Sequence, residues 1–157
     1  MDNTNRTTRV VGDLGISAYI LMHGFKLAGK KDRSFVFFVE DDKIEQFNQL
    51  KFNYLFSEFH YFDHCLMGLK KLEDYMPASN TMEEANISSV NDLGIAAYLL
   101  MHKFKICAKR SKTFYFETPT EEERKQFDET NWQYTSSEYH EFDSKIMSLK
   151  KIVDSYR

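Results

Sequence analysis

Two sets of basic residues could bind phosphate groups. Each set lies in a stretch that the sequence predicts to be a β-hairpin, and aromatic residues follow each set. Cations on a hairpin can contact the phosphates of a nucleic acid or nucleotide, and nearby aromatic rings can stack on its bases. The candidate phosphate-binding residues are Lys26, Lys30, Lys31, Arg33, Lys105, Lys109, Arg110 and Lys112. The alternative is that these cations lie in two solvent-exposed turns and bind no ligand, while the neighbouring aromatic residues face the core.

The charge balance argues against a module built to bind nucleic acid. The chain has a formal net charge of −3, and both halves of the sequence are slightly acidic. Proteins that neutralise many phosphates of duplex DNA are usually strongly basic. Nucleic-acid or nucleotide binding is therefore our alternative function and not the leading one.

A second pattern combines histidine with carboxylates. The motif Glu-x-His-x-x-Asp begins at Glu58 and occurs again at Glu138. These residue types can hold a metal ion. On a helix, however, His60 is a neighbour of Asp63 while Glu58 points elsewhere. We therefore expect residues that start a helix here, and we name no metal ligand.

The sequence offers no catalytic constellation. His23 and His102 each follow an apolar stretch and could act as a base, but a histidine at a helix end more often bonds the last free carbonyls. No serine, cysteine or lysine near them belongs to a recognisable nucleophile motif, and the chain has no glycine-rich phosphate loop. We expect no catalytic residues, no cofactor and no enzyme activity.

The elements that position these residues occur twice. The motif Asp-Leu-Gly-Ile-x-Ala-Tyr begins at Asp13 and again at Asp92. A phenylalanine in the next part of each copy, Phe47 and Phe127, shows that the second copy carries one inserted residue. This pattern predicts a tandem duplication, with a first repeat unit at 1–76, a linker at 77–85 and a second repeat unit at 86–157.

Each repeat predicts the order strand, helix, β-hairpin, helix, helix, which is an α+β unit. The first repeat has these elements at 7–11, 14–23, 25–39, from 41 and from 57, and the second at 86–90, 93–102, 104–116, from 120 and from 137. The first helix of each repeat is apolar almost all round, so we expect no solvated face. Because each unit alone would bury little surface, we expect one compact body with a pseudo-two-fold axis.

The helix starts and one helix interior carry more detailed predictions. Asp13 and Asp92 suit the N-caps of the first helices, and Ser57 and Ser137 suit those of the third helices. Polar residues interrupt the apolar stripe of the second helix in the second repeat, so we expect that helix to be shorter or looser than its counterpart.

The two repeats differ at positions that could contact a partner. Leu55 and Phe56 stand where the second repeat has Thr135 and Ser136. Either the first repeat buries them in a larger core or it exposes an apolar patch, and exposed patches usually mark interfaces. The last helix also has heptad spacing, which is typical of self-association and of any core-facing helix. The candidate protein-interface residues are Phe52, Leu55, Phe56, Trp132, Tyr139 and Tyr156.

The repeated motif resembles a small uncharacterised α+β domain family found mainly in bacteriophage genomes. The resemblance lies in Asp-Leu-Gly-x-x-Ala-Tyr, then Leu-Met-His, Phe-Lys, a basic turn and Phe-x-Phe, and it covers 9–75 and 88–156. It implies a phage or mobile-element origin and an α+β fold, and it supplies no activity.

These observations predict a non-catalytic, phage-type binding protein. Its partner would be a protein: a virion component, a host factor or a second copy in a homo-oligomer. The alternative is nucleic-acid or nucleotide binding through the two basic hairpins, including as an anti-defence protein. We expect it in the host cytoplasm or the virion and not secreted, because residues 1–6 lack the apolar core of a secretory signal. The longest apolar run, 16–22, is too short to span a membrane.

Overall fold

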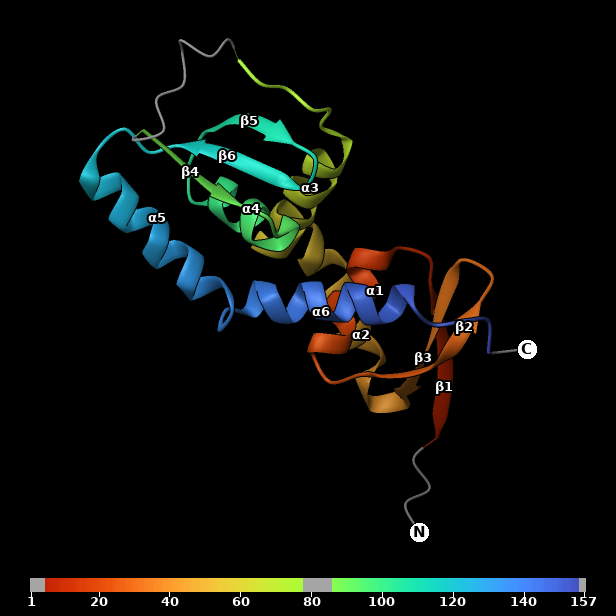
Figure 1. Ribbon diagram of the computed structural model, residues 1–157. Helices are drawn as coiled ribbons and strands as arrows, with labels where there is room; N and C mark the ends of the chain where they lie inside the picture. The colour runs from red at the N-terminus through yellow and green to blue at the C-terminus, as the bar shows by residue number, and fades with distance from the viewer. Residues whose placement is uncertain (1–4, 78–85, 156–157) are drawn as a thin grey trace. The chain divides into compact units, whose positions relative to one another are not determined.

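The computed structural model describes residues 5–77 and 86–155. Within these residues the structure is α+β, with six α-helices and two antiparallel three-stranded sheets (Figure 1). The chain forms two compact units: the first holds 5–60 and 141–155, and the second holds 61–77 and 86–140. The predicted linker 77–85 lies outside the described residues except for Pro77.

The first unit is built on a sheet of order β1-β3-β2 in which both pairings are antiparallel. Between residues 5 and 57 the first unit contains β1 (Arg6–Val11), α1 (Leu14–Met22), β2 (Lys26–Lys31), β3 (Ser34–Glu40), the 3-10 turn η1 (Asp41–Lys43) and α2 (Ile44–Leu55). The sheet is buried around Phe35, Val36 and Phe37 of the central strand β3.

The second unit repeats this order and this topology. Its elements are β4 (Ile87–Val90), α4 (Leu93–Met101), β5 (Ile106–Arg110), β6 (Thr113–Glu117) and α5 (Glu121–Tyr134), and its sheet order is β4-β6-β5. Both hairpins also shift register near the same place, between Leu27 and Gly29 and between Ile106 and Ala108. The predicted order of strand, helix, hairpin and helix is therefore present in both parts of the chain.

The third helices do not stay with the repeat from which they come. These are α3 (Glu58–Lys71) and α6 (Glu138–Lys150). From Tyr61 onward α3 belongs to the second unit, and from Glu141 onward α6 belongs to the first. Each compact unit therefore takes most of its third helix from the other repeat, and the units do not coincide with the sequence repeats.

Aromatic contacts show how each exchanged helix completes its core. In the second unit Phe62 of α3 lies with its ring centroid 6.2 Å from that of Tyr134 and 5.5 Å from that of Tyr139. In the first unit Phe142 of α6 lies 6.1 Å from Tyr54 and has a similar contact with Phe59. Neither Phe62 nor Phe142 is exposed to solvent, and these separations suit favourable aromatic pairs.

The segments after the exchanged helices pair with sheet edges. Tyr75, which follows α3, exchanges two main-chain hydrogen bonds with Lys109 of β5, both with N···O distances of 2.9 Å. Ser155, which follows α6, donates its main-chain N–H to the carbonyl of Lys30 in β2 at 2.9 Å. Each exchanged helix and the segment that follows it therefore belong to the same unit.

The predicted helix caps are confirmed. Asp13 accepts a hydrogen bond from the N–H of Ile16 at 2.8 Å, and Asp92 does the same at the start of α4. Ser57 and Ser137 each accept from the main-chain N–H three residues further on. The prediction that α1 and α4 have no solvated face is also confirmed, since no residue of either helix is exposed. No helix among the described residues is long and apolar enough to cross a membrane.

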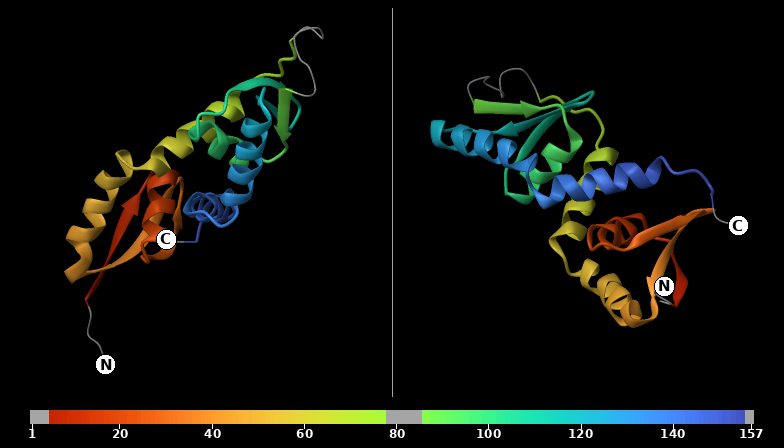
Figure 2. Two further views of the ribbon diagram at one scale, coloured as in Figure 1. Left: turned by 90° about the vertical axis from the view of Figure 1, so that its left-hand side faces the viewer. Right: turned by 90° about the horizontal axis from the view of Figure 1, so that it is seen from below.

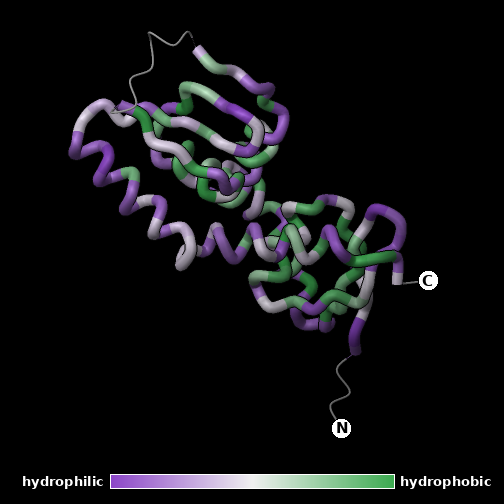
Figure 3. The backbone as a smooth tube through the Cα atoms, viewed as in Figure 1, coloured by the Kyte–Doolittle hydropathy of each residue, from purple (hydrophilic) through white to green (hydrophobic). Residues whose placement is uncertain are grey.

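The prediction that the second helix of the second repeat is shorter is wrong, and the alternative that it is looser stays a prediction. Helix α5 has 14 residues, whereas α2 has 12. Thr120 caps α5 by accepting from the N–H of Glu123 at 3.1 Å. The buried Thr130 donates its hydroxyl to the carbonyl of Gln126 at 2.8 Å, so its polar group is satisfied within the helix. Most of α5 is drawn as hydrophilic in Figure 3.

Candidate protein-interaction groove

A groove of about 310 Å³ lies on the first unit and is lined by residues of β1, α1 and α2 and of the loop after β1. Figure 2 shows the ribbon of this part of the chain, in red to orange, from two further sides. We call the groove the β1–α2 groove. Its lining residues are Val10, Val11, Gly12, Asp13, Ile16, Lys51, Phe52 and Leu55. The lining is mostly apolar, and its charged members are one lysine and one aspartate.

Local structure explains why apolar side chains remain at this surface. Successive residues of a strand point to opposite faces, so Val11 is buried while Val10 is 61% exposed. Helix α2 buries Phe47, Leu50 and Tyr54 in the core. Its other apolar residues therefore lie on the face that is left outside.

The apolar surface continues past the groove at the end of α2. Phe52 is 64% exposed and Leu55 is 49% exposed, and Phe56, the next residue, is 89% exposed. Of the two alternatives for Leu55 and Phe56, the structure therefore shows the exposed apolar patch and not the larger core. Their role as an interface stays a prediction.

Three of the equivalent positions in the second unit carry uncharged polar residues. Where the groove has Val10, Lys51 and Leu55, the second unit has Ser89, Asn131 and Thr135. Trp132 corresponds to Phe52 and is 81% exposed, so one large apolar side chain remains there. The apolar groove is thus a property of the first unit's residues and not of the shared topology.

The groove lining holds one acidic and one basic residue, and β1 adds exposed arginines. The carboxylate of Asp13 is engaged by the first turn of α1. Lys51 lies in the lining, with its ammonium 5.8 Å from the centre of the Phe47 ring. Arg6 and Arg9 are exposed on the neighbouring strand β1. A partner with acidic residues would complement these basic side chains.

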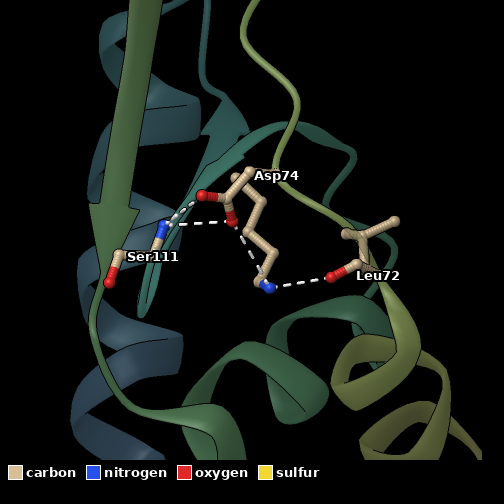
Figure 4. Close-up of polar contacts among 4 residues, drawn as sticks. Leu72, Asp74 and Ser111 are labelled. Atoms are coloured by element: carbon tan, nitrogen blue, oxygen red, sulfur yellow. Dashed lines mark hydrogen bonds and ion pairs between the residues drawn. The ribbon is translucent and has the colours of Figure 1, made fainter.

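Two of the predicted phosphate-binding cations bind the ends of helices instead. Lys109 donates to the carbonyl of Leu72 at 2.7 Å and lies 3.7 Å from the carboxylate of Asp74. Asp74 also accepts from the N–H of Ser111, as Figure 4 shows. Lys30 makes the equivalent contact with the carbonyl of Ile152 at 3.5 Å. Both lysines lie in strands and not in the turns where the sequence predicted them.

The turns themselves are shorter than predicted. They consist of residues 32–33 and 111–112, so Lys31 and Arg110 end a strand while Arg33 and Lys112 lie in the turn. All four of these cations are exposed at the hairpin tips. Of the aromatic residues expected beside them, Tyr115 is half-buried, whereas Phe35, Phe37 and Phe116 are buried in the cores. The three buried rings are not available to stack on bases.

The last two predicted cations line hollows in equivalent places. Lys26 borders a hollow of about 290 Å³ together with Arg6, Lys43, Glu40 and Phe38. The guanidinium of Arg6 lies 5.7 Å from the centre of the Phe38 ring.

The hollow beside Lys105 has a volume of about 360 Å³ and a different charge pattern. It pairs two lysines, Lys103 and Lys105, with the two acids Glu117 and Glu123. The hollow of the first unit has three cations and one acid, so the positive charge is again greater in the first unit.

Four of the five histidines have structural partners. His23 bonds the carbonyl of Tyr19 through Nδ1 at 2.8 Å, and His102 bonds that of Tyr98 at 2.9 Å. This is the helix-end role that we gave as the alternative to catalysis. His60 packs its ring against Tyr54, and His140 does the same in the second unit. The described residues contain no group of three or more histidine, cysteine or acidic side chains that could hold a metal ion.

The cysteines are not activated. Burial raises the pKa of the Cys65 thiol, and a hydrogen bond with Tyr61 and the charge of Lys103 only partly oppose this effect. Burial also raises the pKa of Cys107, and the nearby carboxylate of Glu117 adds to it. A nucleophilic cysteine requires a lowered pKa, so these shifts are in the opposite direction.

The other two predicted interface residues, Tyr139 and Tyr156, do not form an exposed patch among the described residues. Tyr139 is half-buried and packs against Phe62 and Tyr98 in the second unit, so it serves a core. Tyr156 lies outside the described residues. The heptad positions at Phe142, Ile146 and Leu149 are buried in the first unit, whereas Val153 is 77% exposed, so only the helical part of that seam is occupied.

Sequence reasoning did not identify Val10, Ile16 and Lys51 as members of the site. A signal was present, because Val10 and Lys51 align with Ser89 and Asn131 in the second repeat. Ile16 has an identical counterpart, Ile95, so no difference between the repeats could have marked it.

Comparison with protein-family models, with curated proteins and with solved structures finds no match for this chain. The β1–α2 groove and the distribution of charge are therefore the observations on which a function can be based.

Proposed function

We propose that this protein is a non-catalytic binding protein that recognises another protein through the β1–α2 groove and the adjacent Phe56. One observation carries the proposal: Val10, Phe52, Leu55 and Phe56 are exposed together in the first unit. Exposing such side chains to water is unfavourable, at about 25 cal/mol for each Å² of apolar surface. A partner that covers them recovers this free energy.

The composition of the surface suits protein recognition. Binding energy at protein interfaces is concentrated in a few aromatic and aliphatic anchors that enter pockets and are surrounded by polar residues. Phe52 and Leu55 are such anchors, and Lys51 and Asp13 provide polar neighbours. Phe56 does not line the groove, but its exposed side chain extends the apolar surface beyond it.

We further propose that the two repeats arose by tandem duplication. The shared element order, strand order and register shifts support this origin. The second repeat then acquired polar residues where the first keeps the groove. The pseudo-two-fold arrangement of the repeats stays a prediction.

The resemblance to a phage domain family supplies the biological setting of this proposal. In that setting the partner is a virion protein or a host factor, and a second copy of the chain is the alternative. Mass spectrometry of purified virions distinguishes the two settings. A stoichiometric amount of the chain in particles would indicate a virion component, and its absence would indicate action inside the host.

The experiment that tests protein binding uses one substitution at two equivalent positions. Leu55→Glu places a charge in the groove, and Thr135→Glu places the same charge at the matching exposed position of the second unit. Full-length wild type and both variants are immobilised and exposed to virion and host proteins. A partner retained by wild type and by Thr135→Glu but lost from Leu55→Glu supports the proposal. Equal retention by all three chains contradicts it.

A second candidate function rests on the hollow beside Lys26. Three cations meet there around the partly exposed ring of Phe38, and Arg6 already lies near that ring. An anion with an aromatic part, such as a nucleotide, would match this combination of charge and ring. The equivalent hollow in the second unit has balanced charges, so it provides an internal comparison.

The nucleotide hypothesis is tested at low salt with exposed cations only. Lys26→Glu should weaken binding of single-stranded oligonucleotides or ATP, while Lys105→Glu should have a smaller effect. Lys30 and Lys109 are unsuitable for this test, because both bind helix-end carbonyls and their loss would disturb the fold. Gel-shift and fluorescence titrations at two salt concentrations give the readout, and unchanged affinity of Lys26→Glu would reject the hypothesis.

A further inference from the structure

Within the part of the chain that the structure describes, strand β1 is an uncovered sheet edge beside the groove. It lies at the end of the order β1-β3-β2, and among the described residues its strand partner is β3. Five of its six residues are exposed. An edge strand presents unpaired main-chain N–H and C=O groups, which are a template for pairing with another extended segment.

The other edge of the same sheet is already paired. Ser155 donates to the carbonyl of Lys30 in β2, and its hydroxyl accepts from the N–H of Lys30 at 3.3 Å. In the second unit, Tyr75 and Lys109 of β5 each donate a main-chain N–H to the other's carbonyl. Extended segments therefore already add to β2 and β5 in this molecule, whereas the described residues place none on β1.

Strand β4 is the equivalent edge of the second unit, but it differs from β1 in three ways. It has four residues, whereas β1 has six. It carries no charged side chain, whereas β1 carries Arg6 and Arg9. The residues beside its end, Asn131 and Thr135, are polar. Length, charge and apolar surface are thus combined at β1.

We propose that β1 accepts an extended acidic segment of a partner protein as a fourth strand, with apolar side chains of that segment in the β1–α2 groove. This inference rests on the proposed protein-binding function and specifies its partner. Main-chain hydrogen bonds to β1 hold the segment, and the groove selects its side chains. The groove volume of about 310 Å³ is at the low end for ligand pockets, which suits a few side chains and not a folded surface.

Charge identifies an acidic segment as the occupant and not a second copy of β1. Two β1 strands side by side would bring together four arginines, two from each copy. Like charges on neighbouring strands are destabilising, whereas glutamate or aspartate opposite Arg9 is favourable. Alternation of apolar and acidic residues would place one kind in the groove and direct the other kind outward.

The test uses full-length protein and a fluorescent eight-residue peptide that alternates valine with glutamate. A second peptide has the same side chains but N-methyl groups on alternate amides along one edge, and a third has lysine for glutamate. We expect the first peptide to bind. N-methylation should raise its Kd by about tenfold or more, because it removes several main-chain hydrogen bonds of about 1 kcal/mol each. The lysine peptide should bind more weakly still.

Variants and hydrogen exchange locate the site. Arg9→Glu should weaken binding of the glutamate peptide, whereas Lys125→Glu, an exposed position on α5, should not. Bound peptide should slow amide exchange in β1 and leave β4 unchanged. Both results support strand addition to β1.

Other outcomes overturn the inference. These are failure of the glutamate peptide to bind, binding that survives N-methylation without protection of β1, or dimerisation of the chain alone that protects the β1 amides. Each of these outcomes leaves the proposed protein-binding function intact if Leu55→Glu still abolishes partner capture. That function fails only when capture is unaffected by Leu55→Glu.

Discussion

The two units have closely similar interiors and different surfaces. In the first unit the ring centroids of Tyr19 and Tyr54 are 5.5 Å apart, and in the second unit those of Tyr98 and Tyr134 are also 5.5 Å apart. At the surface, by contrast, Leu55 of the first unit corresponds to the polar Thr135. The comparison separates residues that the fold requires from residues that it does not require.

Positions that differ between the units are the stronger functional candidates. An interior contact that is present in both units is explained by packing alone, because cores are densely packed and sensitive to volume. The exposed side chains of the β1–α2 groove have no such explanation, since the second unit keeps its topology with polar residues there. Four predictions test this division, in order of their effect on the free energy of unfolding.

The largest effect should come from the exchanged helices. Phe62 and Phe142 are fully buried, so replacing either with alanine should lower the free energy of unfolding by about 3–5 kcal/mol, measured by denaturant unfolding. Each substitution should destabilise the first helix of the other repeat. Phe62→Ala should speed amide exchange in α4, and Phe142→Ala should speed it in α1.

Met67→Ala is the matched control for these two variants. Met67 lies on α3 but is 44% exposed, so its removal should cost much less. If Phe62→Ala instead loosened α1 of its own repeat and left α4 protected, the helix exchange would be contradicted.

The next effect should distinguish the two lysines at the helix ends. Lys109 lies 2.7 Å from the carbonyl of Leu72 and near Asp74, whereas Lys30 lies 3.5 Å from that of Ile152. Hydrogen bonds from charged groups contribute about 1.5–3 kcal/mol when well made. Lys109→Met should therefore cost about 1–2 kcal/mol, and Lys30→Met should cost less. Equal losses in thermal unfolding would show that the difference in distance has no energetic consequence.

Much of the fold could be predicted from local signals. Asp13, Thr120 and Ser57 mark helix starts because their side chains accept hydrogen bonds from free N–H groups within the next turn. The apolar circumference of α1 predicts burial on all sides in the same way. These predictions depend on residues that are close in sequence.

The failures concern contacts between residues that are distant in sequence. The stripe of α3 shows that Phe62 is buried, but it does not show that the covering residues come from the other repeat. Nor could composition show that Lys109, which the sequence pattern assigns to a basic turn, binds a carbonyl 37 positions away along the chain. The length of α5 was missed because Thr130 can satisfy its hydroxyl within the helix.

The third prediction concerns the caps that the units share. Asp13→Ala and Asp92→Ala should each lower the free energy of unfolding by about 1 kcal/mol, because each leaves a first-turn N–H without its acceptor. Substitution by serine, which can also cap, should restore most of the loss. Effects that differ by much more than the error of urea titrations would show that the two interiors are less alike than their geometry indicates.

The smallest effect on stability should accompany the largest change in binding. Ser89→Val, Asn131→Lys and Thr135→Leu together give the second unit the residues that form the groove around Phe52 in the first. Ser89 and Thr135 are exposed and Asn131 is half-buried, so the free energy of unfolding should change by only about 0.5 kcal/mol. Calorimetric titration with the valine–glutamate peptide should give one site per chain for wild type and a second, weaker site for the grafted chain. The second site should be weaker because β4 is shorter than β1 and lacks its arginines. A grafted chain that still binds a single peptide would show that the strand edge, and not the groove, decides where a partner binds.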